Sequence, residues 1–372
     1  MRVVQVIGRS TGGIGTHAVD LSDHLRALGD QVTVVTDSIT AERFGLVDAR
    51  RWWPSGPTPG SVRNLLRLRR LARSSDVVHA HGHQAGLVAV LAAAGTRVPV
   101  IVSQHNAVLA GGWKRKLSSR LLQRFVAGRA ALSTGASSDL VLEAQRHGAR
   151  EPVLAPVPSP RVPDLLAADP LDRATRAARR AELLQANGVV GEGPMVLTIA
   201  RVAPQKDLDT IIDAASVVGI TSTWVVVGDG DPDLLARLQT RVREEGAPVH
   251  FVGPQSDPAT WLRAAEVFVL TSTWEARALV VQEAMAAGVP VVSTDTGGLR
   301  DLVEGVGELV PVGDAFAVGS AVRGLLSDPK ARESAAAAGR ARAAEWADSE
   351  TTARRWRDWY GRLGGLDQDV ER

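Results

Sequence analysis

Cysteine is absent from this sequence of 372 residues, which excludes structural disulfides and thiolate metal sites. No run of 18 consecutive apolar residues occurs, so no transmembrane helix is expected. The opening residues, MRVVQVIG, lead directly into a strand pattern and lack the basic, long apolar and small-residue layout of a signal peptide. These absences predict a cytoplasmic protein.

Acidic residues are nearly missing from one long stretch of the first half. Between Asp48 and Asp139 the only acid is Asp76, whereas the same window holds fourteen basic residues. These are Arg50, Arg51, Arg63, Arg67, Arg69, Arg70, Arg73, Arg97, Lys114, Arg115, Lys116, Arg120, Arg124 and Arg129. The whole chain carries only +2, so this stretch concentrates positive charge and indicates an anionic partner.

The length favours two domains, because one hydrophobic core rarely serves more than about 250–300 residues. Near-continuous apolar strands are predicted in the first half at 2–7, 31–36, 98–103 and 131–134, with helical stretches at 16–28, 62–73 and 113–126 between them. Strands that are buried on both faces and separated by helices predict a parallel sheet.

The second half repeats this alternation, with strands predicted at 195–200, 223–227, 249–252, 267–270, 289–293 and 309–312. We therefore predict an α/β protein of two doubly wound units, a first domain over 1–165 and a second over 166–345. The segment 346–372 is predicted to form a helix that packs across the junction. Its Trp346, Trp356, Trp359 and Tyr360 need a large apolar surface, and aromatic residues make up only 4% of the chain.

A glycine-rich loop, GRSTGGIGTH, follows the first predicted strand at 8–17. Glycines let the backbone approach a ligand closely, and the next helix points its N-terminus at the same place. Gly13, Gly15 and Ala18 satisfy the dinucleotide-binding fingerprint, and Asp37 lies where a ribose-binding acid is expected. An NAD(P)-dependent oxidoreductase is therefore one alternative function.

Two glutamates in the second half favour a different ligand. Glu275 lies in the loop after a predicted strand, and Glu283 follows eight residues later in a helix that begins near Ala278. The first carboxylate can accept hydrogen bonds from sugar hydroxyls, and the free amides at the helix start can face a diphosphate. The second carboxylate can bind both ribose hydroxyls. The spacing thus predicts a nucleotide-sugar site.

At this motif the chain resembles glycosyltransferase family 4, whose members have the GT-B fold. Glu275-x7-Glu283 is followed by the family-like EAMAAGVPVVSTDTGG, and other landmarks keep the family's order. They are IARVAPQKD at 199–207, VVVGDG at 225–230, HFVG at 250–253, the glycine loop at 12–17, DVVHAHG at 76–82 and SQHN at 103–106. The resemblance covers nearly the whole chain. It implies two Rossmann-like domains facing across a cleft, with a C-terminal helix crossing back to the first.

The resemblance also implies roles for individual residues. The residues matching the catalytic positions are His105, Glu275, Arg201 and Lys206. Those matching the donor-binding positions are Glu283, Arg277, Ala278, Leu279, Val280, Gly228 and Val252. Those of the acceptor-side loop are Gly12, Gly13, Gly15 and His17.

One departure from the family pattern follows Glu275. The family usually has Gly-Phe-Gly-Leu or Ser-Phe-Gly-Leu there, whereas this chain has Ala276-Arg277-Ala278-Leu279. Loss of the glycine restricts the backbone's approach to the diphosphate, and Arg277 adds a cation. The departure bears on donor choice more than on the reaction class.

No metal or other cofactor is expected besides the nucleotide-sugar cosubstrate. Cleavage of the bond between sugar and diphosphate leaves growing negative charge, which Arg201, Lys206 and the amides near Leu279 are suited to stabilise. Asp229 and Asp231 form a D-x-D pattern, which we interpret as part of the glycine turn. Retention of configuration is implied by the family, through a front-face substitution in which the leaving phosphate acts as the base.

Three histidines, His79, His81 and His83, are spaced two residues apart. On a strand, that spacing would place them on one face, where they could bind a metal. Without a carboxylate or cysteine beside them, we interpret them as an edge of the active site together with packing.

The stretch 113–126, WKRKLSSRLLQRFV, has an apolar residue at every fourth position: Trp113, Leu117, Leu121 and Phe125. It contains five basic residues and no acid. This pattern fits a helix that docks on an anionic membrane surface. The alternative is an amphipathic helix with its apolar stripe in the core. A nucleic-acid partner is not expected, because no recognition motif is present.

Together these features predict a glycosyltransferase that uses a UDP- or GDP-sugar and a hydroxyl acceptor that is lipid-linked or phosphorylated. It would be cytoplasmic or peripheral on the inner face of the membrane. A non-catalytic sugar-nucleotide binding protein is the second alternative.

Overall fold

The computed structural model describes residues 1–10, 12–107 and 113–365, with the backbone alone for 113–116. It divides the chain into two compact units. The first comprises Met1–Pro160 and Ala347–Arg372, and the second comprises Arg161–Trp346. Residues 161–165, which the sequence analysis assigned to the first domain, belong to the second unit, where Val162 and Leu165 pack into the core.

The first unit is built on one parallel sheet with the strand order β2-β1-β3-β4-β5-β6. Its strands are β1 (Arg2–Ile7), β2 (Gln31–Val35), β3 (Val77–His81), β4 (Val100–Gln104), β5 (Leu132–Gly135) and β6 (Pro152–Leu154). β1 and β4 are buried along nearly their whole length, as the continuous apolar runs predict. β3 is fully buried as well, although it was not among the predicted strands.

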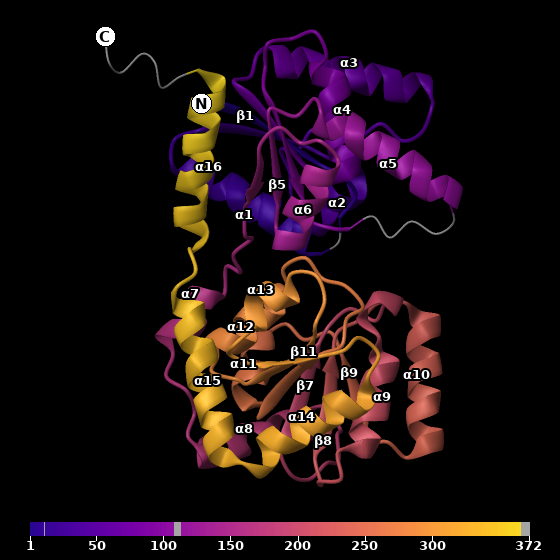
Figure 1. The fold of residues 1–372 in the computed structure, drawn as a ribbon, viewed down its shortest axis with the longest axis vertical. Helices are drawn as coiled ribbons and strands as arrows, with labels where there is room; N and C mark the ends of the chain where they lie inside the picture. Colours follow the sequence, from indigo (N-terminus) through magenta and orange to yellow (C-terminus); the bar gives the residue numbers. More distant parts are fainter. Residues whose placement is uncertain (11, 108–112, 366–372) are drawn as a thin grey trace. The chain divides into compact units, whose positions relative to one another are not determined.

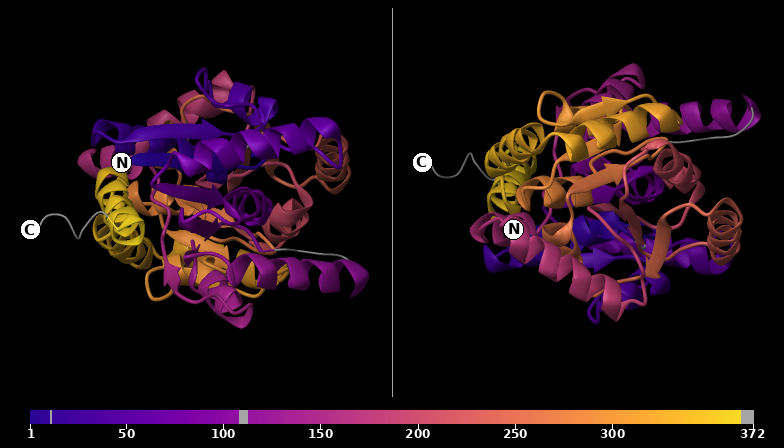
Figure 2. Two further views of the ribbon diagram at one scale, coloured as in Figure 1. Left: turned by 90° about the horizontal axis from the view of Figure 1, so that it is seen from above. Right: turned by 90° about the horizontal axis from the view of Figure 1, so that it is seen from below.

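Helices cover both faces of this sheet (Figures 1 and 2). They are α1 (Gly13–Ala27), α2 (Ser38–Arg43), α3 (Pro59–Arg73), α4 (His83–Ala93), α5 (Trp113–Ala127), α6 (Ser138–Arg146) and the last helix, α16 (Ser349–Gly364). α4 and α3 pack on one face, and α1 and α16 on the other.

The C-terminal helix belongs to the first unit, although the whole second unit, Arg161–Trp346, separates it in sequence from the rest. Trp356, Trp359 and Tyr360 are buried in a cluster with Val3 and Leu25. Trp346 was predicted to be part of this helix, and that prediction was wrong. Asp348 caps the helix by accepting the amide N–H of Thr351, so the helix begins at Ser349.

The second unit is built on another parallel sheet, in the order β12-β11-β10-β7-β8-β9. Its strands are β7 (Met195–Ile199), β8 (Thr223–Val227), β9 (Val249–Gly253), β10 (Val267–Leu270), β11 (Val291–Thr294) and β12 (Glu308–Val310). Successive residues of β7 alternate between two apolar clusters: Met195 and Leu197 lie in one and Val196 in the other. The sheet therefore has a core on each face.

The helices of this unit are α7 (Val162–Ala167), α8 (Arg173–Ala186), α9 (Leu208–Val217), α10 (Pro232–Glu245), α11 (Pro258–Ala264), α12 (Leu279–Ala286), α13 (Leu299–Val303), α14 (Ala315–Ser327) and α15 (Pro329–Ala344), with a 3₁₀ turn at Pro204–Lys206. Aspartate side chains cap the starts of α8, α10, α11, α14 and α15. α12 starts after Ala278, which has no side-chain acceptor to offer.

Candidate active site

The carboxyl edge of the second sheet collects most of the predicted donor-site residues. The loop after β7 carries Arg201 and Lys206, the turn after β8 carries Gly228, and the loop after β10 carries Glu275. Ligands of doubly wound folds bind at this edge, because the loops leaving parallel strands converge there.

Glu275 and Lys206 form a close ion pair at this edge. The Lys206 ammonium donates to Glu275 Oε1 at 2.5 Å, and both side chains are only 13% exposed. Ser272 donates a second hydrogen bond to the same oxygen at 2.9 Å. These contacts engage one carboxylate oxygen and hold the side chain in a fixed orientation.

Two glycines let the loops of this edge approach one another closely. Gly228 has a φ of +140°, and a Cβ there would lie 2.0 Å from the carbonyl oxygen of Ala200, which precedes Arg201. Gly297 has a φ of +50°, and its Cβ would lie 2.1 Å from the carbonyl oxygen of Glu275. Side chains at these positions would push apart the loops that carry Arg201 and Glu275.

The start of α12 is the best candidate for a diphosphate site in this unit. The first residues after Ala278 are Leu279 and Val280, and the N–H groups of a helix's first turn have no partner within the helix. With Ala278 as the preceding residue, no capping side chain competes for them. The positive end of the helix dipole adds to the attraction for an anion.

Glu283 is one turn further along α12 and is 3% exposed. It is paired with Arg161, whose Nη1 donates to Oε1 at 3.2 Å. A buried carboxylate in an apolar helix needs such a partner. Arg161 comes from the proline-rich segment 152–163, PVLAPVPSPRVP, and was not predicted.

The side chain of Arg277 is partly buried. Its guanidinium lies 5.2 Å from the centre of the Trp346 ring, and burial lowers its pKa to about 10, although Asp301 acts in the opposite direction. Its Nε is buried without a hydrogen-bond partner among the described residues. Trp346, expected in the last helix, thus packs against Arg277 in the loop after β10.

The remaining donor-side residues have mixed surroundings. Arg201 is exposed. Val252 lies in β9, and its carbonyl oxygen accepts from the Gln255 amide at 3.0 Å. Asp231, one half of the D-x-D pattern, accepts the N–H groups of Asp233 and Leu234 and so caps α10.

In the first unit the glycine loop leads into α1. Gly12 is the residue before the helix and Gly13 is its first residue. Gly15 lies under the ring of Phe44: a Cβ at Gly15 would be only 2.2 Å from the Cε2 atom of Phe44. Thr11 lies outside the described residues. Gly15 therefore allows α1 to approach Phe44 closely, and Gly12 leaves the start of the helix without a side-chain cap.

Asp37, the expected ribose ligand of a dinucleotide site, has another function in the structure. It caps α2, accepting from the Thr40 N–H at 3.0 Å and from the Thr40 hydroxyl at 2.9 Å. Both carboxylate oxygens are engaged locally, which disfavours the NAD(P) alternative.

His105 follows β4 at the carboxyl edge of the first sheet and is 7% exposed. Its Nε2 lies 3.1 Å from Nδ1 of His81, and its ring lies edge-on to His17. Burial lowers the pKa of His105 to about 3 and that of His17 to about 4. Both imidazoles are therefore neutral at neutral pH. A neutral imidazole both donates and accepts a hydrogen bond.

A cavity of about 560 Å³ opens beside this edge. Its size is typical of a small-molecule site. The polar residues lining it include Arg9, His83, Gln84, Asn106 and Ser119. One cation with several hydroxyl- and amide-bearing side chains is a suitable environment for a hydroxylated, anionic ligand.

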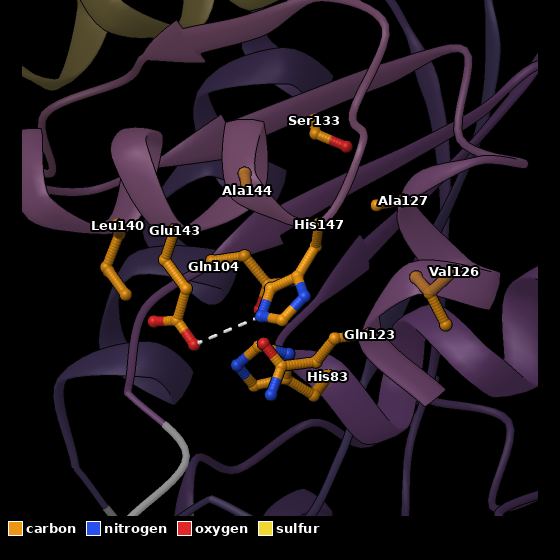
Figure 3. A pocket seen from close by; sticks show the side chains of 10 residues that line it. All are labelled: His83, Gln104, Gln123, Val126, Ala127, Ser133, Leu140, Glu143, Ala144 and His147. Atoms are coloured by element: carbon orange, nitrogen blue, oxygen red, sulfur yellow. Dashed lines mark ion pairs between the residues drawn. The ribbon is translucent and has the colours of Figure 1, made fainter. Parts of the chain in front are cut away.

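A second, much smaller cavity of about 20 Å³ shares His83 and Gln123 with the larger one. Figure 3 shows His83, His147 and the Gln123 amide close together, with His147 paired to Glu143 at 3.7 Å. Buried polar atoms of Gln104, Gln123 and His147 have no protein partner among the described residues. The volume and these atoms suit a single water molecule.

The predicted apolar stripe of α5 faces outward on the first unit. Leu117, Leu121 and Phe125 are 52%, 60% and 37% exposed. Leu122 and Val126, on the other side of the helix, pack into the core. The stripe is therefore not the core-facing side of the helix, and Trp113 lies outside the described side chains.

No helix in the described part of the chain has the length and apolar character needed to cross a membrane.

Sequence patterns missed three contacts of this site. Arg161 lies in a linker without any motif, and Ser272 is one of several serines near strand ends. Gln205 donates to the Trp274 carbonyl and accepts from the Thr273 N–H, which ties the Lys206 and Glu275 loops together. None of these has a sequence signal of its own.

Two family matches cover most of the chain. Residues 179–342 match "Glycosyl transferases group 1", and residues 12–160 match "Glycosyl transferase 4-like domain". The two matches fall in the second and the first unit respectively.

Similar proteins of known name span nearly the full length. The chain is 28% identical to D-inositol 3-phosphate glycosyltransferase of Jonesia denitrificans, covering 90% of this chain and 88% of that protein. It is 27% identical to phosphatidyl-myo-inositol mannosyltransferase of Mycobacterium leprae, covering 88% and 87%.

Solved structures share the fold at lower identity. HepE of Anabaena, in complex with UDP, superimposes with a TM-score of 0.82 at 20% identity, over 96% of this chain and 99% of that one. WaaG, a glycosyltransferase involved in lipopolysaccharide biosynthesis, gives a TM-score of 0.71 at 16% identity, over 97% and 99%. The predicted two-sheet α/β architecture of the GT-B type is confirmed.

Proposed function

Because this chain belongs to glycosyltransferase family 4, we propose that it uses a nucleotide-sugar donor. In this proposal it transfers the sugar of a UDP- or GDP-sugar, with retention of configuration, to a hydroxyl of a phosphate-bearing acceptor. The observation that carries the proposal is the arrangement of Lys206, Glu275 and the uncapped start of α12 at one sheet edge. Lys206 supplies a cation, the Glu275 carboxylate can accept hydrogen bonds from sugar hydroxyls, and the start of α12 supplies free amides. These are the groups that a sugar diphosphate requires.

The donor site works through charge. As the bond between sugar and diphosphate breaks, negative charge grows on the leaving phosphates. Lys206, Arg201 and the amides of Leu279 and Val280 stabilise that charge. Glu275 has one oxygen held by Lys206 and Ser272, and its other oxygen accepts from sugar hydroxyls. Glu283 binds the ribose hydroxyls in place of, or beside, Arg161.

Retention follows from a front-face substitution in this proposal. The leaving phosphate takes the acceptor's proton as the new glycosidic bond forms on the face from which the diphosphate departs. His105 orients the reacting sugar or the acceptor. With the leaving group neutralised by protein cations and amides, no metal is needed, and activity is expected to survive an excess of EDTA.

The acceptor is proposed to carry a phosphate. The cavity of the first unit is lined by Arg9 and by residues of the basic stretch between Asp48 and Asp139, such as Asn106 and Ser119. Relatives are named for D-inositol 3-phosphate and phosphatidyl-myo-inositol, which share a phosphate on a polyhydroxylated ring. A phosphorylated polyol is the acceptor class that these features fit best.

The exposed face of α5 is proposed to dock on an anionic membrane. Leu117, Leu121 and Phe125 form an exposed apolar row flanked by Arg120 and Arg124. Apolar area with surrounding cations is the combination that interfacial helices use. Co-sedimentation with vesicles of phosphatidylglycerol and phosphatidylcholine tests this. Leu121→Ser should weaken binding at least severalfold, and binding that is indifferent to this change would contradict it.

The first test is a thermal-shift panel with UDP, GDP, ADP, NAD and NADP on wild type and Glu283→Ala. A ligand at about a hundred times its Kd adds roughly 2.7 kcal/mol to stability. UDP or GDP should raise the midpoint for wild type and not for the variant. Stabilisation by NAD or NADP alone would overturn the proposal. Nucleotide binding without any sugar transfer to phosphorylated polyols would indicate a binding protein.

A further inference from the structure

A hydrogen-bonded group of buried side chains connects the last helix to His105. We call Gln5, His79, His81, His105 and Tyr360 the histidine network. Gln5 Nε2 donates to the Tyr360 hydroxyl at 3.3 Å, Gln5 Oε1 lies 2.6 Å from His81 Nε2, and His81 Nδ1 lies 3.1 Å from His105 Nε2. Gln5 and Tyr360 are fully buried, and Tyr360 lies on α16 beside the first sheet (Figure 1).

A second branch of the network gives the proton of the Tyr360 hydroxyl an acceptor. Nδ1 of His79 lies 2.6 Å from that hydroxyl, and Nε2 of His79 lies 2.7 Å from Ser103 Oγ. Ser103 Oγ is in turn 2.7 Å from the Thr134 hydroxyl. Because the Gln5 amide nitrogen donates to the Tyr360 oxygen, the Tyr360 hydroxyl directs its own proton to its other partner, Nδ1 of His79. This keeps the Gln5 amide nitrogen toward Tyr360 and its oxygen toward His81.

The orientation of Gln5 determines where the histidine protons reside. An amide oxygen only accepts, so Nε2 of His81 carries the proton. Burial lowers the pKa of both His81 and His105, so each ring holds one proton. Nδ1 of His81 is then an acceptor, and Nε2–H of His105 donates to it. Nδ1 of His105, which has no hydrogen bond within the described residues, keeps its lone pair.

A metal ion is the competing explanation, because ring nitrogens of His17, His81 and His105 lie within 4.8 Å of one another. The His81 and His105 rings are 14° from coplanar, with centroids 5.4 Å apart and facing nitrogens 3.1 Å apart. A ring nitrogen lies less than a bond length from its centroid, so these nitrogens are close to the line joining the centroids. They point at each other, as in an N–H···N bond. Ligands of one ion point instead at a shared third position about 2.0–2.1 Å away.

We propose that Tyr360 and Gln5 are positioning residues that hold His105 in its Nε2–H tautomer and leave Nδ1 to accept a hydrogen bond from a substrate hydroxyl. This rests on the proposed function in one respect, that His105 faces the reacting sugar or acceptor. The C-terminal helix then contributes to the chemistry of the first unit through a single phenolic hydroxyl. Its apolar residues contribute only packing.

The tautomer is directly measurable in the full chain. In ¹⁵N-histidine-labelled protein, two-bond ¹⁵N–¹H correlations distinguish Nε2–H from Nδ1–H, and His105→Gln assigns the signal. Wild type should show His105 as Nε2–H. In Tyr360→Phe the Gln5 amide loses its acceptor and is free to turn its nitrogen toward His81. His81 then donates to His105, and the Nδ1–H form should appear.

Kinetics supply the second readout. Tyr360→Phe should lower kcat about tenfold or more while the donor KM stays within about twofold, since a wrongly protonated histidine impairs the reaction more than ground-state binding. Gln5→Glu keeps an oxygen toward His81 and should retain the wild-type tautomer and more activity than Gln5→Leu. Leu363→Ala is the matched control. It packs in the same cluster of α16 but takes no part in the network, so it should lower stability without changing the tautomer.

Several results would overturn the proposal. These are an Nδ1–H tautomer of His105 in wild type, an unchanged tautomer in Tyr360→Phe, or an equal loss of kcat in Leu363→Ala. Stoichiometric zinc that is lost in His81→Ala would replace the network with a metal site. The tautomer measurement needs no turnover. A chain that transfers no sugar but shows the expected tautomer change would refute the proposed function and leave the role of Tyr360 and Gln5 standing.

Discussion

Mild acid should destabilise the first unit, because two of its buried histidines resist protonation. Burial lowers the pKa of His17 to about 4 and that of His105 to about 3, whereas an unfolded histidine titrates near 6.5. The unfolded chain therefore binds protons that the native chain does not. The stability contributed by these neutral rings is fully present above about pH 6.5 and is lost as the pH falls toward the native values.

The size of the effect follows from the difference in pKa. At pH 5 an unfolded histidine is almost fully protonated and these two native rings are almost fully neutral. Each ring then costs about 2 kcal/mol relative to pH 7, at 1.36 kcal/mol per pKa unit. The pair costs about 4 kcal/mol, a large share of the 5–15 kcal/mol that is typical of a domain. The pKa values of His79 and His81 are lowered in the same direction by burial and add to the loss.

Urea unfolding at pH 7 and pH 5, with hydrogen exchange read by mass spectrometry, measures this loss and locates it. Peptides of β3 and β4 should lose protection after correction for the intrinsic exchange rate, and peptides of β7 should not. His17→Gln should remove about 2 kcal/mol of the pH-dependent loss. If the variant and the wild type lose the same stability between the two pH values, the burial argument for His17 is refuted.

Two further substitutions test the donor site. Lys206→Met removes the cation paired with Glu275 and should lower kcat about 100-fold or more in an initial-rate assay with the nucleotide sugar, and a loss below threefold would contradict its role. Gly228→Ala places a Cβ 2.0 Å from the Ala200 carbonyl oxygen and should cost about 3 kcal/mol or more in urea unfolding. Gly246→Ala, also at positive φ but with nothing within 4 Å, is the control and should cost only about 1 kcal/mol.

The sequence was sufficient to predict the second sheet and to bring Glu275 and Lys206 together at its carboxyl edge. Apolar runs buried on both faces identify parallel strands, and Glu275 and Glu283 have a spacing that few other sites need. Glu275 and Lys206 were predicted for one site and are in contact in the structure, although they are 69 residues apart. Their roles in the reaction remain predictions.

Other features depended on long-range partners that no local pattern encodes. Trp346 was assigned to the last helix by its aromatic character, whereas the cap at Asp348 starts the helix later and Trp346 packs against Arg277. Asp37 matched a ribose-binding position by spacing alone, yet its hydrogen bonds to Thr40 make it a helix cap. A carboxylate near a strand end has both uses, and only its neighbours in space distinguish them.

The first unit is built from two separate segments of the chain, and this has a consequence for its synthesis on the ribosome. Its sheet is complete once residue 160 has emerged, but Trp356, Trp359 and Tyr360 arrive only after the whole second unit has been translated. Until then Val3 and Leu25 lack the aromatic layer that covers them, and His79 lacks its tyrosine partner. The second unit is one continuous segment and can fold as it emerges. The nascent first unit must therefore wait, with one apolar face open, until α16 has been translated.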